Sequence, residues 1–247
     1  MVKCKTLVEF LAQYLSVADF DDGCVNGLQV EGKEEIRKIV AGVSASQRLF
    51  QQASRESADL VLVHHGLFWK KQPLLALTGF QKQRLLMLLR DDINLLAYHL
   101  PLDAHPQLGN NARILAELKL AQSAAVDVGF IGEYQRSLAF ADFITLIREK
   151  ITPEPMVFHF GAEAVKRVLV ISGGSSYSYG IADNFCVDTF ICGDMKENFV
   201  REIEETGLNV INAGHYNTEK FGIQALCGLI REEFDVSCQF IDIPNPV

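Results

Sequence analysis

Short apolar runs alternate with amphipathic stretches along most of the chain. The first stretch has apolar residues at positions 7, 10, 11, 14 and 15, and this spacing predicts an amphipathic helix. An apolar run at 36–43, a helical pattern at 45–57 with Ser44 as its cap, and an apolar strand from 61 that ends in the two histidines 64 and 65 follow. Their order predicts a β-α-β unit, in which the two strands are parallel.

The alternation continues toward the C-terminus. We predict helices over 81–90, 111–118, 139–150, 195–206 and 219–233, and strands over 93–98, 156–160, 168–172, 188–192, 209–213 and 238–243. Strands that alternate with helices predict mainly parallel sheets covered by helices, so the predicted fold class is α/β. At 120–137 the composition becomes small and polar, and we interpret this segment as a domain boundary.

Composition and charge narrow the function classes. The 247 residues are enough for one large α/β domain or two smaller ones. The net charge of −8 argues against general nucleic-acid binding and against an anionic membrane surface as partner. Since no apolar run approaches the ~20 residues of a membrane helix, and the N-terminal residues lack a secretory signal, we expect a cytoplasmic protein. The six cysteines include no Cys-x-x-Cys pair and are expected to be buried thiols.

Several side chains of metal-binding type follow the ends of predicted strands. In sheets of parallel strands, ligands gather at the carboxyl ends of the strands. Topology could therefore bring several of these residues to one edge of a sheet. They are His64, His65, His99, Asp103, Asp194 and His215.

His64 and His65 are adjacent at the end of an apolar strand, and Gly66 follows them. Neighbouring side chains in a strand point to opposite faces, so both imidazoles can serve one site only if the backbone leaves regular strand geometry there. Glycine permits such a turn. The alternative is one hydrogen-bonded core histidine beside one surface histidine.

His215 and Glu219 are four residues apart, which places both on one helix face if the helix has already begun. If the helix begins later, Glu219 lies in its first turn, where the helix dipole favours an ionised carboxylate. Either geometry suits a metal ligand, and a capping arrangement with an incidental histidine is the alternative. Asp103 lies in a loop that Pro101 and Pro106 stiffen, which suits a ligand as well.

Five of these side chains offer three imidazoles, two carboxylates and no thiolate. This mixture suits zinc, manganese, iron or nickel. It exceeds what one tetrahedral zinc with an open position needs, but it fits two divalent metals that share a bridging carboxylate. Such a pair can activate a water molecule and polarise a carbonyl, amidine or phosphoryl group. The five are His64, His65, Asp103, His215 and Glu219.

Three further features have two interpretations each. His99 and His105 flank Asp103 and either orient a ligand or carry a proton, or they only pack the loop. The segment Gly173-Gly174-Ser175-Ser176 follows a predicted strand and is either an anion-binding loop or an ordinary tight turn. Asp194 either reaches the site or caps the next helix.

With these motifs in place, the chain resembles the YbgI-like proteins of the Nif-three-like family, known as GTP cyclohydrolase 1 type 2 homologues. The resemblance spans nearly the whole length, and the combination of motifs is highly specific. The motifs are Asn26-Gly27-Leu28-Gln29-Val30-Glu31-Gly32, Val63-His64-His65-Gly66, His99-Leu100-Pro101-Leu102-Asp103 with Gly109-Asn110-Asn111, Ala213-Gly214-His215 through Glu219, and Phe240-Ile241-Asp242-Ile243-Pro244-Asn245-Pro246.

The resemblance implies a dinuclear metal centre in which Glu219 bridges both metals. It also implies two interlinked α/β domains, the middle one inserted into the first, and a ring-shaped homohexamer with the metal sites facing its cavity. We place the metal-binding domain at 1–126 with 189–247, and the inserted domain at 127–188. The implied ligands are His64, His65, Asp103, His215 and Glu219.

We therefore predict a dinuclear-metal-dependent hydrolase of cyclohydrolase type. Its substrate is expected to be a small nucleotide-like or heterocyclic molecule, attacked by a metal-activated water. The candidate catalytic residues are Glu219, His99 and His105. The alternative is a non-enzymatic metal-binding ring that engages nucleic acid or a protein partner, although the net charge of −8 disfavours phosphate binding.

Overall fold

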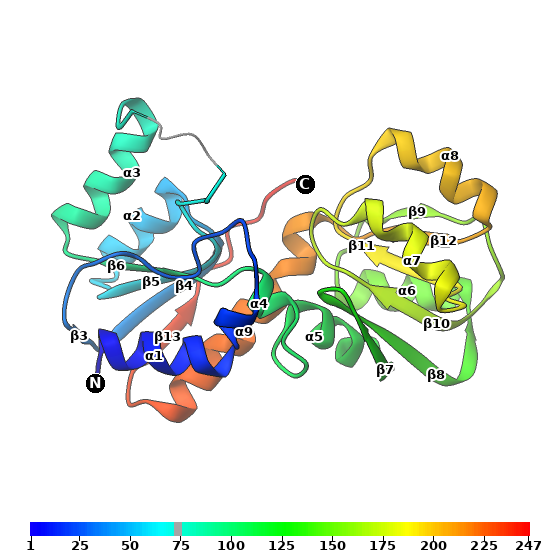
Figure 1. The fold of residues 1–247 in the computed structure, drawn as a ribbon, viewed down its shortest axis with the longest axis horizontal. Coiled ribbons are helices and arrows are strands. Elements are labelled where there is room, and N and C mark those ends of the chain that lie inside the picture. The colour runs from blue at the N-terminus through cyan, green and yellow to red at the C-terminus, as the bar shows by residue number, and fades with distance from the viewer. Residues whose placement is uncertain (72–75) are drawn as a thin grey trace. The chain divides into compact units, whose positions relative to one another are not determined.

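The computed structural model describes residues 1–71 and 76–247, which divide into two compact units. Each unit has its own sheet covered by helices, so the predicted α/β class is confirmed (Figure 1). No helix in the described ranges is long and apolar enough to span a membrane. The units are Met1–Leu102 with Ile223–Ile243 (unit 1) and Asp103–Gly222 with Pro244–Val247 (unit 2), so the long segment of unit 2 interrupts the sequence of unit 1.

Unit 1 contains a five-stranded sheet in the order β13-β4-β5-β6-β2. Four strands are parallel, and β2 pairs antiparallel with β6 at one edge. Helices α2 and α3 lie over one face of this sheet and α1 over the other (Figure 1). The bounds are Val2–Lys3 (β1), Cys4–Tyr14 (α1), Gly27–Val30 (β2), Glu35–Ile36 (β3), Lys38–Ser44 (β4), Gln47–Arg55 (α2), Leu60–His65 (β5), Gly79–Arg90 (α3), Asn94–Ala97 (β6) and Ser237–Phe240 (β13).

Strand β5 shows how the sequence produces this sheet. The four apolar residues before its histidines are fully buried, as expected for a strand with parallel neighbours and covered faces. In the pairing of β4 with β5, Ser44 lies opposite His65. The prediction that Ser44 caps a helix is therefore wrong. Ser46 is the N-cap of α2, because its Oγ accepts a hydrogen bond from the backbone N of Leu49 at 3.3 Å.

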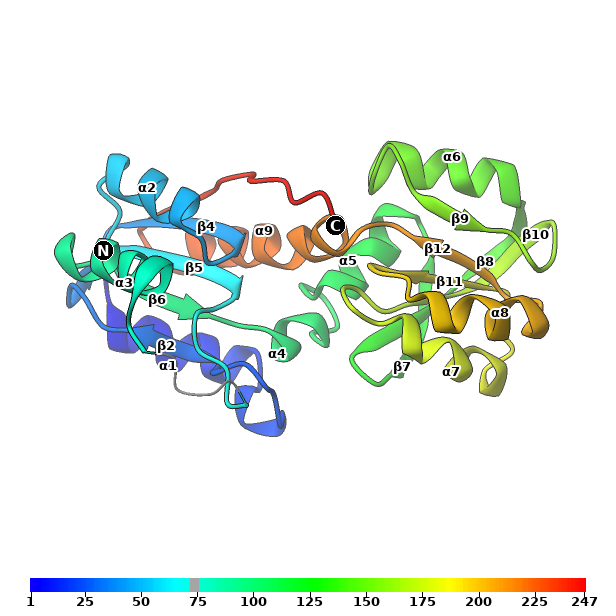
Figure 2. The ribbon, with the colours of Figure 1, turned by 90° about the horizontal axis from the view of Figure 1, so that it is seen from above.

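Unit 2 contains a six-stranded sheet in the order β7-β8-β10-β11-β12-β9. Helix α6 lies over one face, and α7 and α8 lie over the other (Figure 2). The bounds are Asn110–Glu117 (α5), Ala121–Val126 (β7), Gly129–Ala139 (β8), Phe140–Lys150 (α6), Met156–Phe158 (β9), Ala164–Val170 (β10), Tyr179–Asn184 (α7), Thr189–Cys192 (β11), Glu197–Thr206 (α8) and Asn209–Asn212 (β12). Two more helices, α4 (Leu100–Asp103) and α9 (His215–Glu233), contain two of the three positions at which the chain passes from one unit to the other, and the third lies between Ile243 and Pro244.

The alternation of side chains along β10 builds two cores in unit 2. Val168 and Val170 pack with α5 and α6, where Leu115 and Phe143 are buried. Leu169, between the two valines, points to the opposite face and packs in the core that α7 and α8 cover. This is the two-residue period of a strand that is buried on both sides.

Unit 2 differs from the sequence predictions in two respects. Its sheet is mixed, because β7, β8 and β9 are antiparallel to their neighbours. The segment 120–137 lies in the hairpin of β7 and β8 instead of forming a boundary, and the exposed side chains of edge strand β7 give it the composition of a linker. The predicted boundary at 126/127 thus falls in the turn of this hairpin. The one at 188/189 falls between β10 and β11, which pair in one sheet.

Candidate metal centre

Unit 1 brings together three imidazoles, which we call the histidine half-site: His64, His65 and His99. Each offers a ligand nitrogen, and these nitrogens lie within 4.8 Å of one another. The ring centroids of His64 and His65 are 4.7 Å apart, and that of His99 is 5.0 Å from His64. The strand end therefore brings the ring nitrogens of two neighbouring histidines close enough to bind at one place.

The orientation of His64 and His65 is set by partners on adjacent strands and loops. Nδ1 of His64 lies 2.9 Å from the backbone oxygen of Tyr98, and since a carbonyl only accepts, Nδ1 carries the hydrogen. Nδ1 of His65 lies 3.0 Å from Oγ of Ser44, its register partner on β4. Nε2 is then the ring nitrogen of His64 that can bind a metal, because a ligating imidazole needs an unprotonated nitrogen.

Gly66 has a different role from the one expected from the sequence. A Cβ at this position would overlap the side-chain amide of Gln29. Oε1 of Gln29 accepts hydrogen bonds from the backbone N of Leu67 at 2.7 Å and of Phe68 at 3.1 Å, so the amide holds the chain just after β5. Close approach of this side chain, and not a left-handed backbone, is what the glycine provides.

His99 is held by Asp22, a residue that the sequence did not single out. Nδ1 of His99 lies 2.8 Å from Oδ1 of Asp22, and the backbone N of His99 donates to Oδ1 of Asn26 at 2.7 Å. Burial of Asp22 would raise its pKa, but hydrogen bonds from His99, Asn26 and the backbone N of Cys24 outweigh burial and hold the pKa well below its usual range. The ring of Trp69 meets His99 edge-on, with 5.1 Å between centroids.

Unit 2 brings together a second set, which we call the carboxylate half-site: Asp103, His215 and Glu219. Helix α9 begins at His215, so His215 and Glu219 lie on one helix face, and Nε2 of His215 is 3.1 Å from Oε2 of Glu219. Carboxylate oxygens of Asp103 and Glu219 lie within 4.8 Å of each other. Both carboxylates are buried, with 4% of Asp103 and 3% of Glu219 exposed.

The two carboxylates of this half-site are supported by residues distant in sequence. Oδ1 of Asp103 accepts hydrogen bonds from Nδ2 of Asn110 at 2.8 Å and from Oγ of Ser172 at 3.0 Å. Glu219 lies against Gly173, which has a φ of 64° and at which a Cβ would overlap Oε1 of Glu219. Glycine at this position therefore leaves the room that the carboxylate occupies.

The glycine-rich segment after β10 is a tight turn. The backbone N of Gly173 donates to Oγ1 of Thr218 at 3.0 Å, and that of Ser175 donates to the oxygen of Gly173 at 2.9 Å. The backbone N of Ser176 donates to Oδ1 of Asp194 at 3.1 Å. These N–H groups bond within the protein, which disfavours an anion-binding loop. Asp194 supports this turn and does not cap α8, whose N-cap is Lys196.

His105 makes the hydrogen bonds of a loop residue. Its Nδ1 accepts from the backbone N of Gln107 at 3.3 Å and of Leu108 at 3.1 Å, and burial lowers its pKa. These bonds match the loop-packing alternative, and a catalytic role for His105 stays a prediction.

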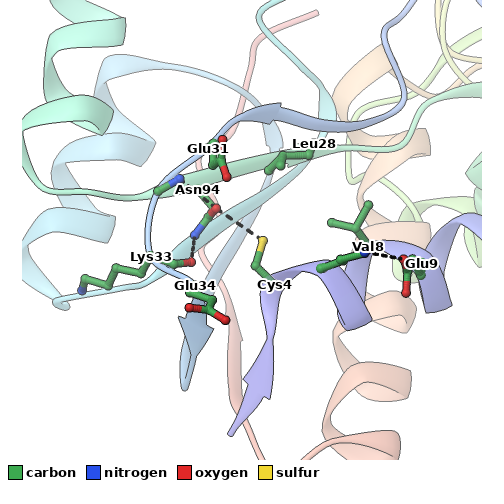
Figure 3. Close-up of a pocket in the computed structure, with 10 residues that line it drawn as sticks. Cys4, Val8, Glu9, Leu28, Glu31, Lys33, Glu34 and Asn94 are labelled. Carbon is green, nitrogen blue, oxygen red and sulfur yellow. Dashed lines mark hydrogen bonds and ion pairs between the residues drawn. The ribbon is translucent and has the colours of Figure 1, made fainter.

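A cavity of about 560 Å³ lies elsewhere in unit 1, between α1 and the segment after β2 (Figure 3). Asn94 uses its side chain entirely for internal bonds: Oδ1 accepts from Cys4 Sγ and the backbone N of Gly32, and Nδ2 donates to the oxygens of Lys33 and Asp59. None of the ten lining residues is a candidate metal ligand. Size alone therefore does not make this cavity the functional site.

Comparison with known proteins gives this chain a family. The sequence profile of Duf34/NIF3 (NGG1p interacting factor 3) matches residues 2–246. The chain belongs to the Duf34/NIF3 family. Among its relatives are two proteins named GTP cyclohydrolase 1 type 2 homolog. The one from Pseudomonas aeruginosa is 38% identical and covers 99% of both chains, and the one from Escherichia coli (strain K12) is 40% identical and covers 99% of this chain and 100% of the relative.

Solved structures agree with the assignment to the Duf34/NIF3 family. Protein ybgI is 40% identical and superposes with a TM-score of 0.96 over 100% of both chains. TTHA1606 from Thermus thermophilus is 36% identical, with a TM-score of 0.92 over 100% of both chains. Reduced HcgD from Methanocaldococcus jannaschii is 26% identical, with a TM-score of 0.86 over 98% of both chains. The fold and the family are thereby established.

Proposed function

We propose that this Duf34/NIF3 protein is a dinuclear-metal-dependent hydrolase of cyclohydrolase type. The observation that carries the proposal is the donor set, which consists of imidazole nitrogens and carboxylate oxygens held by internal hydrogen bonds and contains no thiolate. The name of the relatives, GTP cyclohydrolase 1 type 2 homolog, supports a nucleotide-like or heterocyclic small molecule as substrate.

The proposal joins the two half-sites into one centre with His64, His65, Asp103, His215 and Glu219 as ligands. The connectivity of the chain supports this joining, because α4 and α9 contain two of the three positions at which the chain passes between the units, and Asp103, His215 and Glu219 lie in these two helices. Glu219 has two carboxylate oxygens and is the proposed bridging ligand.

Each side chain of the proposed centre has a definite task. When bound, a pair of divalent metals supplies Lewis acidity and makes water nucleophilic near neutral pH. His64 and His65 would hold the metals through the nitrogen away from their orienting partners, and Asp103 would do so while Asn110 and Ser172 hold its carboxylate in place. The identity of the metals, among zinc, iron, manganese and nickel, is left to elemental analysis.

The test measures turnover and metal content on the same sample. Purified protein with quantified metal is incubated with GTP and a broad panel of nucleotides and related heterocycles. Glu219→Ala is expected to abolish turnover, because it removes the proposed bridging ligand. Glu232→Ala, an exposed change on the same helix α9, is the matched control and should keep full activity.

Two results would contradict the proposal. A protein that carries two metals per chain and turns over no compound of the panel is not this hydrolase. Salt-dependent binding of nucleic acid or a protein partner that survives Glu219→Ala would instead indicate the non-enzymatic metal-binding ring.

We further propose a ring-shaped homohexamer that works in the cytoplasm. Exposed apolar side chains on and beside α3 support burial against another chain: Leu77, Phe80 and Leu89 are each at least 60% exposed. Mass photometry should give six times the 27.5 kDa of one chain, and a monomer at working concentration would contradict the ring.

A further inference from the structure

Asp22 is a buried carboxylate to which the proposed reaction gives no task. Only 2% of this residue is exposed. Its oxygens accept four hydrogen bonds, of which two come from its own loop and two from the segment after β6. The donors are the backbone N of Cys24 at 2.9 Å, Nδ2 of Asn26 at 2.9 Å, Nδ1 of His99 at 2.8 Å and the backbone N of Leu100 at 2.9 Å.

The hydrogen bond with Asp22 defines which ring nitrogen of His99 carries the hydrogen. An ionised carboxylate can only accept hydrogen bonds, so Nδ1 of His99 must donate to Asp22. In the neutral imidazole, Nε2 then carries the lone pair. Asn26 holds the backbone of the same residue, since its Oδ1 accepts from the N of His99 while its Nδ2 donates to Asp22. The loop 22–26 thus holds both the backbone and the ring of His99.

His99 is more accessible than the neighbouring His64. The side chain of His99 is 18% exposed, whereas His64 is fully buried. Its ring centroid lies 5.6 Å from that of His65. An imidazole with a defined acceptor nitrogen next to the rings of His64 and His65 can accept a hydrogen bond from a bound molecule.

We propose that Asp22 is a positioning residue, which with Asn26 holds His99 in the Nδ1–H tautomer and presents its Nε2 as a hydrogen-bond acceptor to the substrate. The proposal rests on the hydrolase function proposed above. It specifies the substrate further, because a molecule that satisfies Nε2 must carry an N–H or O–H group beside the atom that reacts. Heterocycles with a ring N–H or an exocyclic amino group have this chemistry.

The first test reads the tautomer directly and needs no substrate. The chain has six histidines, so solid-state 15N spectra of protein labelled only at histidine resolve few signals, and His99→Gln identifies those of His99. At pH about 8, where free imidazole is neutral, Nδ1 of His99 should be protonated and Nε2 unprotonated. Asp22→Asn should shift His99 toward the other tautomer.

Asp59→Asn is the matched control for Asp22→Asn. Asp59 is also a buried carboxylate of unit 1, and it accepts hydrogen bonds from Nζ of Lys33 and from the backbone N of Arg37 and Lys38. Its replacement should lower stability and leave the spectrum of His99 unchanged. A wild-type His99 protonated at Nε2, or a tautomer unaffected by Asp22→Asn, overturns the proposal.

The second test separates a substrate-facing imidazole from a metal ligand. Asp22→Asn and His99→Gln should retain the metal content of the wild type, and Asp22→Asn should lower kcat about 10- to 100-fold on any compound of the panel that is turned over. Loss of metal in His99→Gln would make His99 a ligand and overturn its assignment to substrate. If the panel yields no turnover, the hydrolase proposal fails while the spectra still decide the role of Asp22.

Discussion

Gly173→Ala is expected to weaken metal binding while the fold survives. A Cβ at this position would overlap Oε1 of Glu219 and lie 3.2 Å from Nε2 of His215. The φ of 64° adds a cost, because an alanine in the left-handed region is less stable by about 1–2 kcal/mol. The overlapped atom is the far end of a flexible side chain, so rotation of Glu219 relieves the overlap. The carboxylate then leaves its position next to His215.

Gly207→Ala is the control for Gly173→Ala, because it carries the same cost in stability from a left-handed backbone without touching the proposed metal centre. Gly207 has a φ of 69°, and a Cβ there would lie 3.7 Å from the oxygen of Phe160, an ordinary contact. Both variants should lose about 1–2 kcal/mol, which corresponds to a fall of about 2–8 °C in Tm for a chain of this size. Only Gly173→Ala displaces a proposed ligand.

The assay compares metal per chain and Tm for the two variants after identical loading. Elemental analysis should show less metal in Gly173→Ala than in Gly207→Ala at similar Tm. Equal metal content in both would refute the reasoning, because it would mean that the position of the Glu219 carboxylate next to Gly173 does not matter for binding.

Two further changes test the histidine half-site and the acid stability of unit 1. We assign His64 and His65 to different metals of the proposed pair, so His65→Ala should remove one metal preferentially, and retention of two full equivalents in elemental analysis would refute this assignment. Burial of Asp59 would raise its pKa, but hydrogen bonds from Lys33 and from the backbone N of Arg37 and Lys38 outweigh it and lower the pKa. The ionised carboxylate of Asp59 therefore stabilises the fold fully at a pH above the ordinary carboxyl pKa of about 3.9. This stabilisation is lost as the pH falls through the lowered pKa that Asp59 has in the folded protein. Asp59→Asn should cost about 1–3 kcal/mol in urea unfolding at pH 7, and a difference from wild type that does not shrink in acid would contradict this account.

The sequence predicted the class of fold because strand and helix periods are local properties. The apolar run that becomes β5 and the amphipathic pattern of α2 can be read without knowledge of any distant contact. The same local analysis failed at 120–137, since the exposed side chains of an edge strand have the composition of a linker. It also placed the helix cap at Ser44, because only strand pairing shows that this residue belongs to β4.

The sequence by itself determined which side chains could bind metal: imidazoles and carboxylates at strand ends and at the start of a long helix. Only the tertiary structure decided which partners orient them, because those partners lie far away along the chain. Asp22 holds His99 from 77 residues away, and Ser172 supports Asp103 from 69 residues away. No local pattern encodes such contacts. The physical reason is that a periodic pattern specifies which face of an element is buried, whereas packing of distant segments specifies the tautomer and direction of each candidate ligand.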